Sequence, residues 1–245
     1  MGAVPGGGLL TEELADAAKA RFDVDVYRPL GRTVVLRDVD RPVVVLGSTQ
    51  PRSVLDDARA AATGVEVARR RSGGGAVLLV PGRQVWADVW IPRDDPLWSD
   101  EPRRMAVSVG EWWASALGAP GGAVHRGGSV AARGSDVVCF AGVGPGEVLV
   151  AGRKLVGLAQ WRSRQGALVH GCAYRVWEPE PLIDLLVMDG RARRLFSATL
   201  ATAAIGLDAI GVAPTWGAGA LEAALPDGPP WDVRVQTAFP GVPEP

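Results

Sequence analysis

Short valine-rich segments separated by glycine and proline run through most of this chain. The 245 residues include 32 glycines and 19 prolines, scattered between apolar segments rather than gathered in one low-complexity block. β-branched residues favour strands, whereas glycine and proline favour tight turns. Strands joined by such short connections pair mainly with antiparallel neighbours. The pattern therefore argues against a doubly wound parallel sheet.

Helical periodicity interrupts this pattern at a few places. Strands are expected at 24–30, 33–37, 42–46, between Gly64 and Arg69, and at 77–80, 84–91, 137–140, 147–150, 154–161 and 167–174. Helices are expected at 11–21, from Ser53 to Thr63, and at 101–117, 181–187 and 191–205, before a tail rich in proline and glycine. Pro81 and Gly82 predict a hairpin between 77–80 and 84–91. The expected fold class is α+β, a mixed, largely antiparallel sheet flanked by helices.

Charge and cysteine content exclude several classes of protein. Lysine and arginine number 26 against 27 acidic residues, so no overall field draws the chain to nucleic acid or an anionic membrane. No apolar run approaches the roughly 20 residues that cross a bilayer, and the first ten residues lack a signal-peptide pattern. Cys139 and Cys172 are too few for a disulfide framework or a four-cysteine zinc site. We expect a cytoplasmic protein with free thiols and no metal-binding cluster.

The first segment with chemical content covers residues 69–77, where Arg69, Arg70 and Arg71 lead into Ser72 and three glycines. Glycines allow backbone amides to approach a ligand closely, and arginines donate to phosphate or carboxylate. The segment is thus a candidate anion-binding loop. The alternative is a flexible turn beside solvated charges. The spacing matches neither a P-loop nor a dinucleotide-binding fingerprint.

A second segment, residues 152–160, places Lys154 at the start of an apolar strand flanked by glycines. Such a lysine can extend its ammonium toward a ligand, although a lysine near a hairpin turn is commonly just solvated. His170 and Gly171 follow after one more turn.

In this order, the segments resemble the lipoate-protein ligase A family, which carries R-R-x-S-G-G-G-A-V, then G-[RK]-K-[LIV]-x-G-[SA]-A-Q, then an H-G pair. The matching positions are Arg69, Arg70, 72–77, 152–160, His170 and Gly171. The resemblance spans 42–174, and biotin ligases and octanoyltransferases share the same core. It implies an α+β fold with a single catalytic domain over 1–245, lacking the separate C-terminal accessory domain of the larger ligases.

The resemblance also implies a mechanism. The carboxylate of lipoate would attack ATP to give an acyl-adenylate, and the acyl group would pass to a lysine of a lipoyl carrier domain or a glycine-cleavage H-type protein. Lys154 would be the catalytic residue, bridging acid and α-phosphate, and Mg2+ would neutralise the departing pyrophosphate. The nucleotide would be held by Lys154, Arg70, Gly75, Ala76, Val77 and Leu78. The acid would be held by Ser72, Gly73, Gly74, Gly157, Ala159 and His170, the last of which could equally be structural.

Two positions depart from the ligase pattern. Leu158 replaces the usual serine or alanine and is expected to narrow the acid pocket. Leu78, Leu79 and Val80 follow Gly-Ala-Val where the ligases have a His-Asp pair, so Asp88 is a candidate substitute in a polar or metal-binding role. The identity of the acid stays open among lipoate, octanoate, biotin and others.

Two alternatives compete with the ligase. One is an octanoyltransferase in which Cys139, fifteen positions before Lys154, forms a thioester with the acyl group. Against this, Cys139 could be a buried small hydrophobe between Val138 and Phe140. The other alternative is a homologue that binds the cofactor without turnover.

Overall fold

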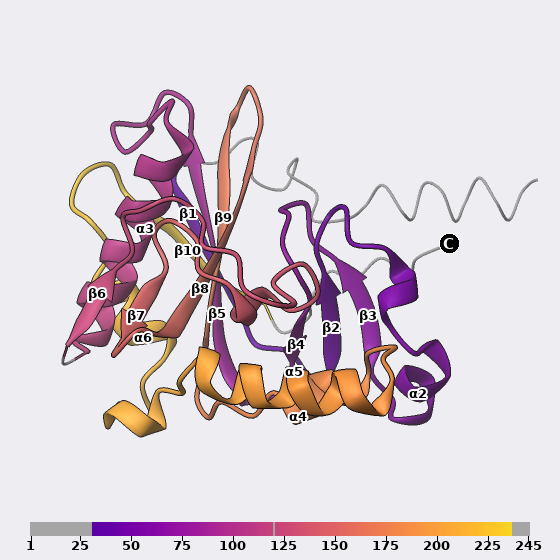
Figure 1. The fold of residues 1–245 in the computed structure, drawn as a ribbon. Coiled ribbons are helices and arrows are strands. Elements are labelled where there is room, and N and C mark those ends of the chain that lie inside the picture. The colour runs from indigo at the N-terminus through magenta and orange to yellow at the C-terminus, as the bar shows by residue number, and fades with distance from the viewer. Residues whose placement is uncertain (1–30, 120, 237–245) are drawn as a thin grey trace, which may run out of the picture.

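A computed structural model describes residues 31–119 and 121–236, which form two sheets with helices around them (Figure 1). The seven-stranded sheet has the order β10-β1-β5-β9-β8-β7-β6, and the three-stranded sheet has the order β3-β2-β4. Among the described strands, only β1–β10 and β2–β3 pair in parallel, so the predicted mixed, largely antiparallel architecture is confirmed. The strands are β1 (Thr33–Arg37), β2 (Val43–Leu46), β3 (Glu66–Arg69), β4 (Val77–Leu79), β5 (Gln84–Pro92), β6 (Gly122–Val124), β7 (Val148–Val150), β8 (Arg153–Arg162), β9 (Gly166–Tyr174) and β10 (Asp232–Gln236).

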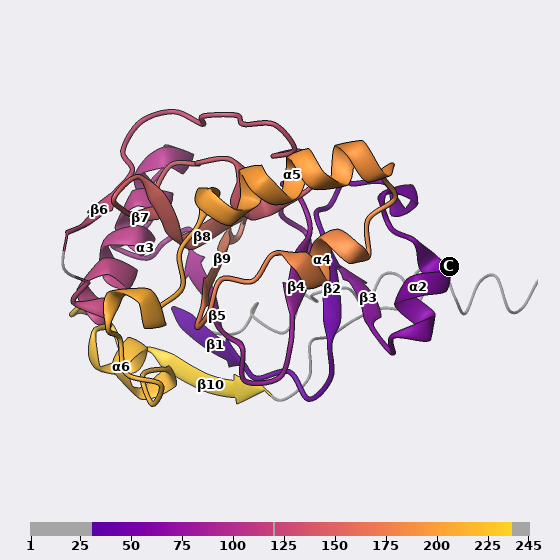
Figure 2. The ribbon, with the colours of Figure 1, turned by 60° about the horizontal axis from the view of Figure 1, so that its bottom comes forward.

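Different helices provide most of the cover of each sheet. The helices are α2 (Asp57–Ala62), α3 (Pro102–Leu117), α4 (Glu180–Asp184), α5 (Gly190–Ala203) and α6 (Ala218–Ala223), with short 3-10 turns η2 (Arg52–Val54), η3 (Cys139–Ala141) and η4 (Asp208–Ile210). Helix α3 contacts β6, β7, β8 and α6, whereas α4 and α5 run along the three-stranded sheet (Figure 2). Helix α5 also contacts β8 and so links the two sheets.

Two hydrophobic cores follow from this arrangement. One joins the three-stranded sheet to α4, α5 and η3, and the other lies between the seven-stranded sheet and α3. In α3, Trp112 and Trp113 are buried as the helical spacing predicted. The helix begins with Pro102, which needs no amide partner there, and ends at Gly118 in the left-handed conformation. Its boundaries therefore follow from local sequence.

The predicted hairpin between 77–80 and 84–91 is wrong. Both strands exist, but β4 pairs with β2 and β5 pairs with β1 and β9. The Val80 amide donates to the Gln84 side chain at 2.9 Å, and the Arg83 amide donates to the Val80 carbonyl at 3.0 Å. The turn at Pro81 and Gly82 thus leads the chain from one sheet to the other.

Other predicted elements also needed correction. Residues 137–140 do not form a strand, because Val138 makes only an isolated bridge to Ala76 and η3 begins at Cys139. Helix α2 begins after Asp56, whose side chain caps the Arg59 amide, rather than after Ser53. The expected tail contains α6 and β10. The expected elements at 11–21 and 24–30 lie outside the described residues.

None of the helices in the described part of the chain has the length and apolar character needed to cross a membrane.

Candidate functional site

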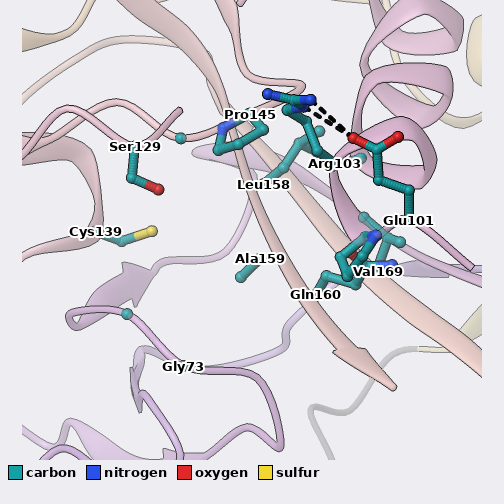
Figure 3. Close-up of a pocket in the computed structure, with 14 residues that line it drawn as sticks. Gly73, Glu101, Arg103, Ser129, Cys139, Pro145, Leu158, Ala159, Gln160 and Val169 are labelled. Carbon is teal, nitrogen blue, oxygen red and sulfur yellow. Dashed lines mark hydrogen bonds and ion pairs between the residues drawn. The ribbon is translucent and has the colours of Figure 1, made fainter. Parts of the chain in front are cut away.

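A cavity lies along the part of β8 that extends beyond its pairing with β7. Strand β7 pairs with β8 only through residues 153–156, and the register shifts between Val148 and Leu149. Among the described strands, residues 157–162 of β8 are therefore paired on the β9 side alone. The cavity at this edge, about 610 Å³ in volume, is bounded by the glycine loop, the start of α3, Cys139 and β8 (Figure 3).

The glycine loop forms one wall and is held from behind by Arg70. The buried guanidinium donates to the carbonyls of Val45 at 3.1 Å, Gly73 at 2.8 Å and Gly75 at 2.8 Å, and to the Ser72 hydroxyl at 3.1 Å. Burial lowers the pKa of Arg70, although an arginine stays charged at neutral pH. Arg70 thus fixes the shape of the loop from inside the protein.

The three glycines of the loop have different roles. Gly74 has φ of 94°, a conformation that residues with a side chain rarely adopt. A Cβ on Gly75 would lie 2.6 Å from the Val137 carbonyl carbon, so only glycine fits there. Gly73 and Gly74 line the cavity.

The residues that follow the loop lie behind the cavity wall. The Ala76 amide donates to the Val137 carbonyl at 2.7 Å, and the Cys139 amide donates back to the Ala76 carbonyl at 3.1 Å. Val77 and Leu78 are buried in β4. The loop is therefore packed directly against the segment that carries Cys139.

Lys154 lies behind the cavity wall, with its ammonium against the backbone of Cys139. Its side chain is 2% exposed, and its Nζ is 2.8 Å from the Cys139 carbonyl and 2.8 Å from Oε2 of Glu147. The ammonium also lies 5.4 Å from the centre of the Phe140 ring, a distance at which cation and ring attract. Gly157 brings β8 close beneath this ring, because a Cβ there would lie 3.0 Å from it.

Glu147 is a site residue that the sequence did not reveal. Besides Lys154, its carboxylate accepts hydrogen bonds from the Gly144 amide at 2.7 Å and the Leu158 amide at 3.1 Å. Burial raises the pKa of this carboxyl group, opposed by the Lys154 charge. The signal that could have found it is an acidic residue in an apolar strand directly before the lysine motif.

Cys139 and Ala159 face the cavity. Figure 3 shows the Cys139 thiol pointing inward, with Ser129 beside it and Ala159 across from it. Cys139 is partly exposed, whereas Cys172 is buried and its thiol pKa is raised by that burial. Of the two cysteines, Cys139 is the one that a substrate in this cavity can reach.

His170 belongs to a different cluster inside the seven-stranded sheet. Its Nδ1 is 2.6 Å from the Asp88 carboxylate, which also accepts from the Trp86 indole at 2.6 Å and pairs with Arg37. Burial opposes ionisation of Asp88, but Arg37 and His170 together hold its pKa below the usual range. Neither His170 nor Asp88 lines the cavity.

The start of α3 and the strands β8 and β9 also contribute residues to the cavity wall. Arg103 and Glu101 form an ion pair at 2.9 Å beside the cavity. Leu158, which was expected to narrow the acid pocket, lines the cavity together with Gln160 and Val169. Nε2 of Gln160 is buried and has no hydrogen-bond partner among the described residues. These residues come from segments far apart in sequence.

A family model describes the relation of this chain to known proteins. The model of the lipoyl protein ligase A/B catalytic domain matches residues 21–188. The chain belongs to this family. The match contains both the glycine loop and the Lys154 segment. No curated protein matches the sequence significantly.

Solved structures of lipoate-protein ligases share the fold. A lipoate-protein ligase A bound with ATP matches with a TM-score of 0.65 at 17% identity, covering 91% of this chain and 84% of that one. A bi-partite lipoate protein ligase from Thermoplasma acidophilum, described with its E2 lipoyl domain, gives 0.64 at 18% identity, covering 91% and 82%. A structure from the same organism with bound lipoic acid gives 0.64 at 17%, covering 97% and 86%.

Proposed function

We propose that this protein is an ATP-dependent lipoate-protein ligase. A carboxylate oxygen of the acid attacks the α-phosphorus of ATP, and the bond to pyrophosphate breaks. The ε-amine of a carrier lysine then attacks the acyl carbon of the adenylate, so that an amide forms, AMP leaves and the amine loses a proton. The carrier is a lipoyl domain or a glycine-cleavage H-type protein.

One observation supports this proposal above the others. A single cavity joins Gly73 and Gly74 of the glycine loop to Ala159 of the lysine-bearing strand, with the Lys154 ammonium 2.8 Å from the carbonyl of Cys139 on its wall. Two motifs that stand far apart in the sequence therefore meet at one place. An ammonium fixed there would stabilise the charge that builds on the α-phosphate during attack.

The residues divide into those that would touch substrate and those that would act behind the wall. Gly73, Gly74 and Ala159 would contact acid or nucleotide directly. Ser72 and Arg70 would shape the loop, since the guanidinium of Arg70 already donates to three carbonyls and a hydroxyl. Gly75, Ala76, Val77 and Leu78 would support the nucleotide wall. Gly157 would keep β8 close to Phe140, and His170 would stabilise the sheet.

Magnesium would enter with the nucleotide. The part of the chain that the structure describes holds no group of three or more His, Cys, Asp or Glu side chains arranged for a metal ion. Mg2+ is commonly held by substrate phosphates together with one or two carboxylates and water. Its role would be to neutralise charge on the departing pyrophosphate.

The test is mass spectrometry of a purified lipoyl domain incubated with ATP, Mg2+ and lipoate, octanoate or biotin in turn. A ligase adds the mass of the acid minus one water to the carrier, and adds nothing when ATP is omitted. The Lys154→Ala variant should lose about 100-fold or more in rate. Equal modification by this variant would remove Lys154 from the proposed role.

A second candidate function is an octanoyltransferase, favoured by the position of Cys139. Its thiol lines the cavity, and its carbonyl accepts from the Lys154 ammonium. The Cys139 thiolate would attack the acyl thioester of an acyl carrier protein, releasing the carrier thiol. The lysine amine of the second carrier would then attack the enzyme thioester and free Cys139.

Acyl carrier protein loaded with octanoate separates the two functions. Transfer without ATP, lost in Cys139→Ser, would establish the transferase and exclude the ligase. Ligation with free acid and ATP that persists in Cys139→Ser would do the reverse. Binding of acid without either reaction would mark a non-catalytic homologue.

A further inference from the structure

A buried carboxylate, that of Glu147, lies behind the cavity wall and belongs to neither sequence motif. Glu147 directly precedes β7, and its side chain is 2% exposed. A buried charge is tolerated only where partners compensate its loss of water. Glu147 has three such partners: the Lys154 ammonium and two backbone amides, those of Gly144 and Leu158.

The two amides belong to segments that line the cavity. Gly144 lies on the loop after η3, and Leu158 lies on the half of β8 that has no β7 partner. The β7–β8 ladder ends at the Val148–Val156 pair, before Leu158, so the outward amide of Leu158 needs another acceptor. Glu147 supplies it and thereby ties the loop to the strand.

The same carboxylate fixes the ammonium of Lys154. Glu147 and the Cys139 carbonyl each lie 2.8 Å from Nζ, and a lysine ammonium has three N–H donors. Two acceptors on the protein leave one donor for a substrate oxygen. The direction of that donor depends on where the other two are held.

We propose that Glu147 is a positioning residue that holds the Lys154 ammonium and the two adjoining wall segments in the geometry needed for catalysis. This inference rests on the proposed function, because it assigns Lys154 the contact with the reacting groups. Glu147 itself touches no substrate. A loss of its carboxylate should therefore change turnover more than substrate binding, since a small displacement of a catalytic group costs much of its effect.

A purely structural role would give a different pattern. It would lower thermal stability while leaving the turnover of the folded enzyme and its pH profile unchanged. Among the described residues, Lys154 is the charged group that contacts Glu147. Because burial raises the pKa of Glu147, a rate that depends on its ionised form should fall on the acid side at a pH above the ordinary glutamate range.

The experiment measures kcat and KM for acid and ATP between pH 5 and pH 8, using full-length protein and a purified lipoyl domain. The variants are Glu147→Gln, which removes the charge, and Glu147→Asp, which keeps it. Glu178→Gln is the matched control, because Glu178 is half exposed and pairs with Arg83 on the surface. Thermal melting of each variant reports the folded fraction.

In Glu147→Gln, we expect kcat to fall about tenfold or more with KM changed less than about threefold, and the acid limb of the profile to disappear. Glu147→Asp should recover part of kcat and keep an acid limb, and Glu178→Gln should match the wild type. A folded Glu147→Gln with wild-type kcat and profile would overturn the proposal. If Glu147→Gln does not fold, Glu147→Asp decides: unchanged kcat overturns the proposal, and reduced kcat with unchanged KM supports it. Inactive wild-type protein would instead refute the proposed function.

Discussion

The two walls of the cavity are each held from behind by one buried charged side chain, and these side chains have opposite sign. Arg70 donates to two carbonyls and a hydroxyl of the glycine loop and to the Val45 carbonyl of β2. Glu147 accepts from two backbone amides and from Lys154 on the β7–β8 side. Each side chain ties a loop to a neighbouring strand: Arg70 links the glycine loop to β2, and Glu147 links the loop at Gly144 to β8.

Arg70 and Glu147 differ in how their buried charges are compensated. Among the described residues, Arg70 has no carboxylate within ion-pair distance, and only dipoles compensate its charge. Glu147 is paired with a full opposite charge that the proposed mechanism uses. Arg70 therefore shapes the loop alone, whereas Glu147 both shapes its wall and holds the ammonium that the proposed mechanism uses. Four predictions test this contrast, beginning with the largest expected effect.

Removing only one member of the Glu147–Lys154 pair should give the largest loss in the free energy of unfolding. Lys154→Met leaves the Glu147 carboxylate buried without its counter-charge, which should lower the free energy of unfolding by about 3–5 kcal/mol. The double variant with Glu147→Leu should be less destabilised than the sum of the single variants, with a coupling of about 2 kcal/mol. Urea unfolding of the four proteins measures this cycle. Additive effects would contradict the pairing.

Arg70→Met should lower the free energy of unfolding by less than Lys154→Met. It removes a buried charge, whereas Lys154→Met leaves the Glu147 carboxylate buried without a counter-charge. The carbonyls of Val45, Gly73 and Gly75 lose a donor, for a total of about 3 kcal/mol. Arg83→Met, at an arginine in a surface ion pair, serves as control and should change stability by less than about 1 kcal/mol. A larger loss in Arg70→Met than in Lys154→Met would reverse the contrast drawn above.

Gly75→Ala should distinguish the packed part of the glycine loop from its open part. The new Cβ would approach the backbone of Val137 and Val138 to about 2.6 Å, so the two segments must separate. We expect a loss of about 2 kcal/mol in unfolding free energy. Gly73→Ala is the matched control, because no atom lies within 4 Å of its Cβ position and stability should change by less than about 0.5 kcal/mol. Equal losses would mean that the loop is not packed as described.

Of the two buried charges, only Glu147 should make the stability of the protein depend on pH. Burial raises the pKa of Glu147 in the folded protein, so the fold favours its protonated form. Its contribution to stability is therefore greatest below the unfolded glutamate pKa of about 4.3 and declines as pH rises toward the folded value. The difference in unfolding free energy between wild type and Glu147→Gln should shrink over this interval. The difference between wild type and Arg70→Met should stay constant, and a pH-dependent one would be inconsistent with a purely conformational Arg70.

Local sequence predicted where several helices and strands lie, but not which strands pair. Helix α3 followed from the spacing of Met105, Val109, Trp112 and Trp113, and β8 and β9 followed from short, largely apolar segments bounded by glycines. The hairpin after β4 was wrong because a tight turn constrains the path of the chain but not the choice of strand partner. Strand β10 was missed because its pairing with β1 joins residues nearly 200 positions apart.

The candidate site was predicted to a similar extent. The glycine loop and the Lys154 strand were found because each motif is contiguous, and they do meet at one cavity. The role of Arg70 was not predictable in detail, since its partners Val45 and Gly75 come together only when β2 and the loop pack. His170 was expected near the acid, but its place on β9 directs it to Asp88.

The sequence by itself determined the chemical groups available, the family to which they belong and the α+β class, because motifs and periodicity are properties of neighbouring residues. Only the tertiary structure decided which groups face the cavity and which stand behind it. The ion pair of Glu147 with Lys154 shows the reason, because it joins residues that meet where β7 pairs with β8, and no local pattern specifies that pairing. The direction of a buried charge is fixed by the partners that compensate it, and these partners are assembled only by packing.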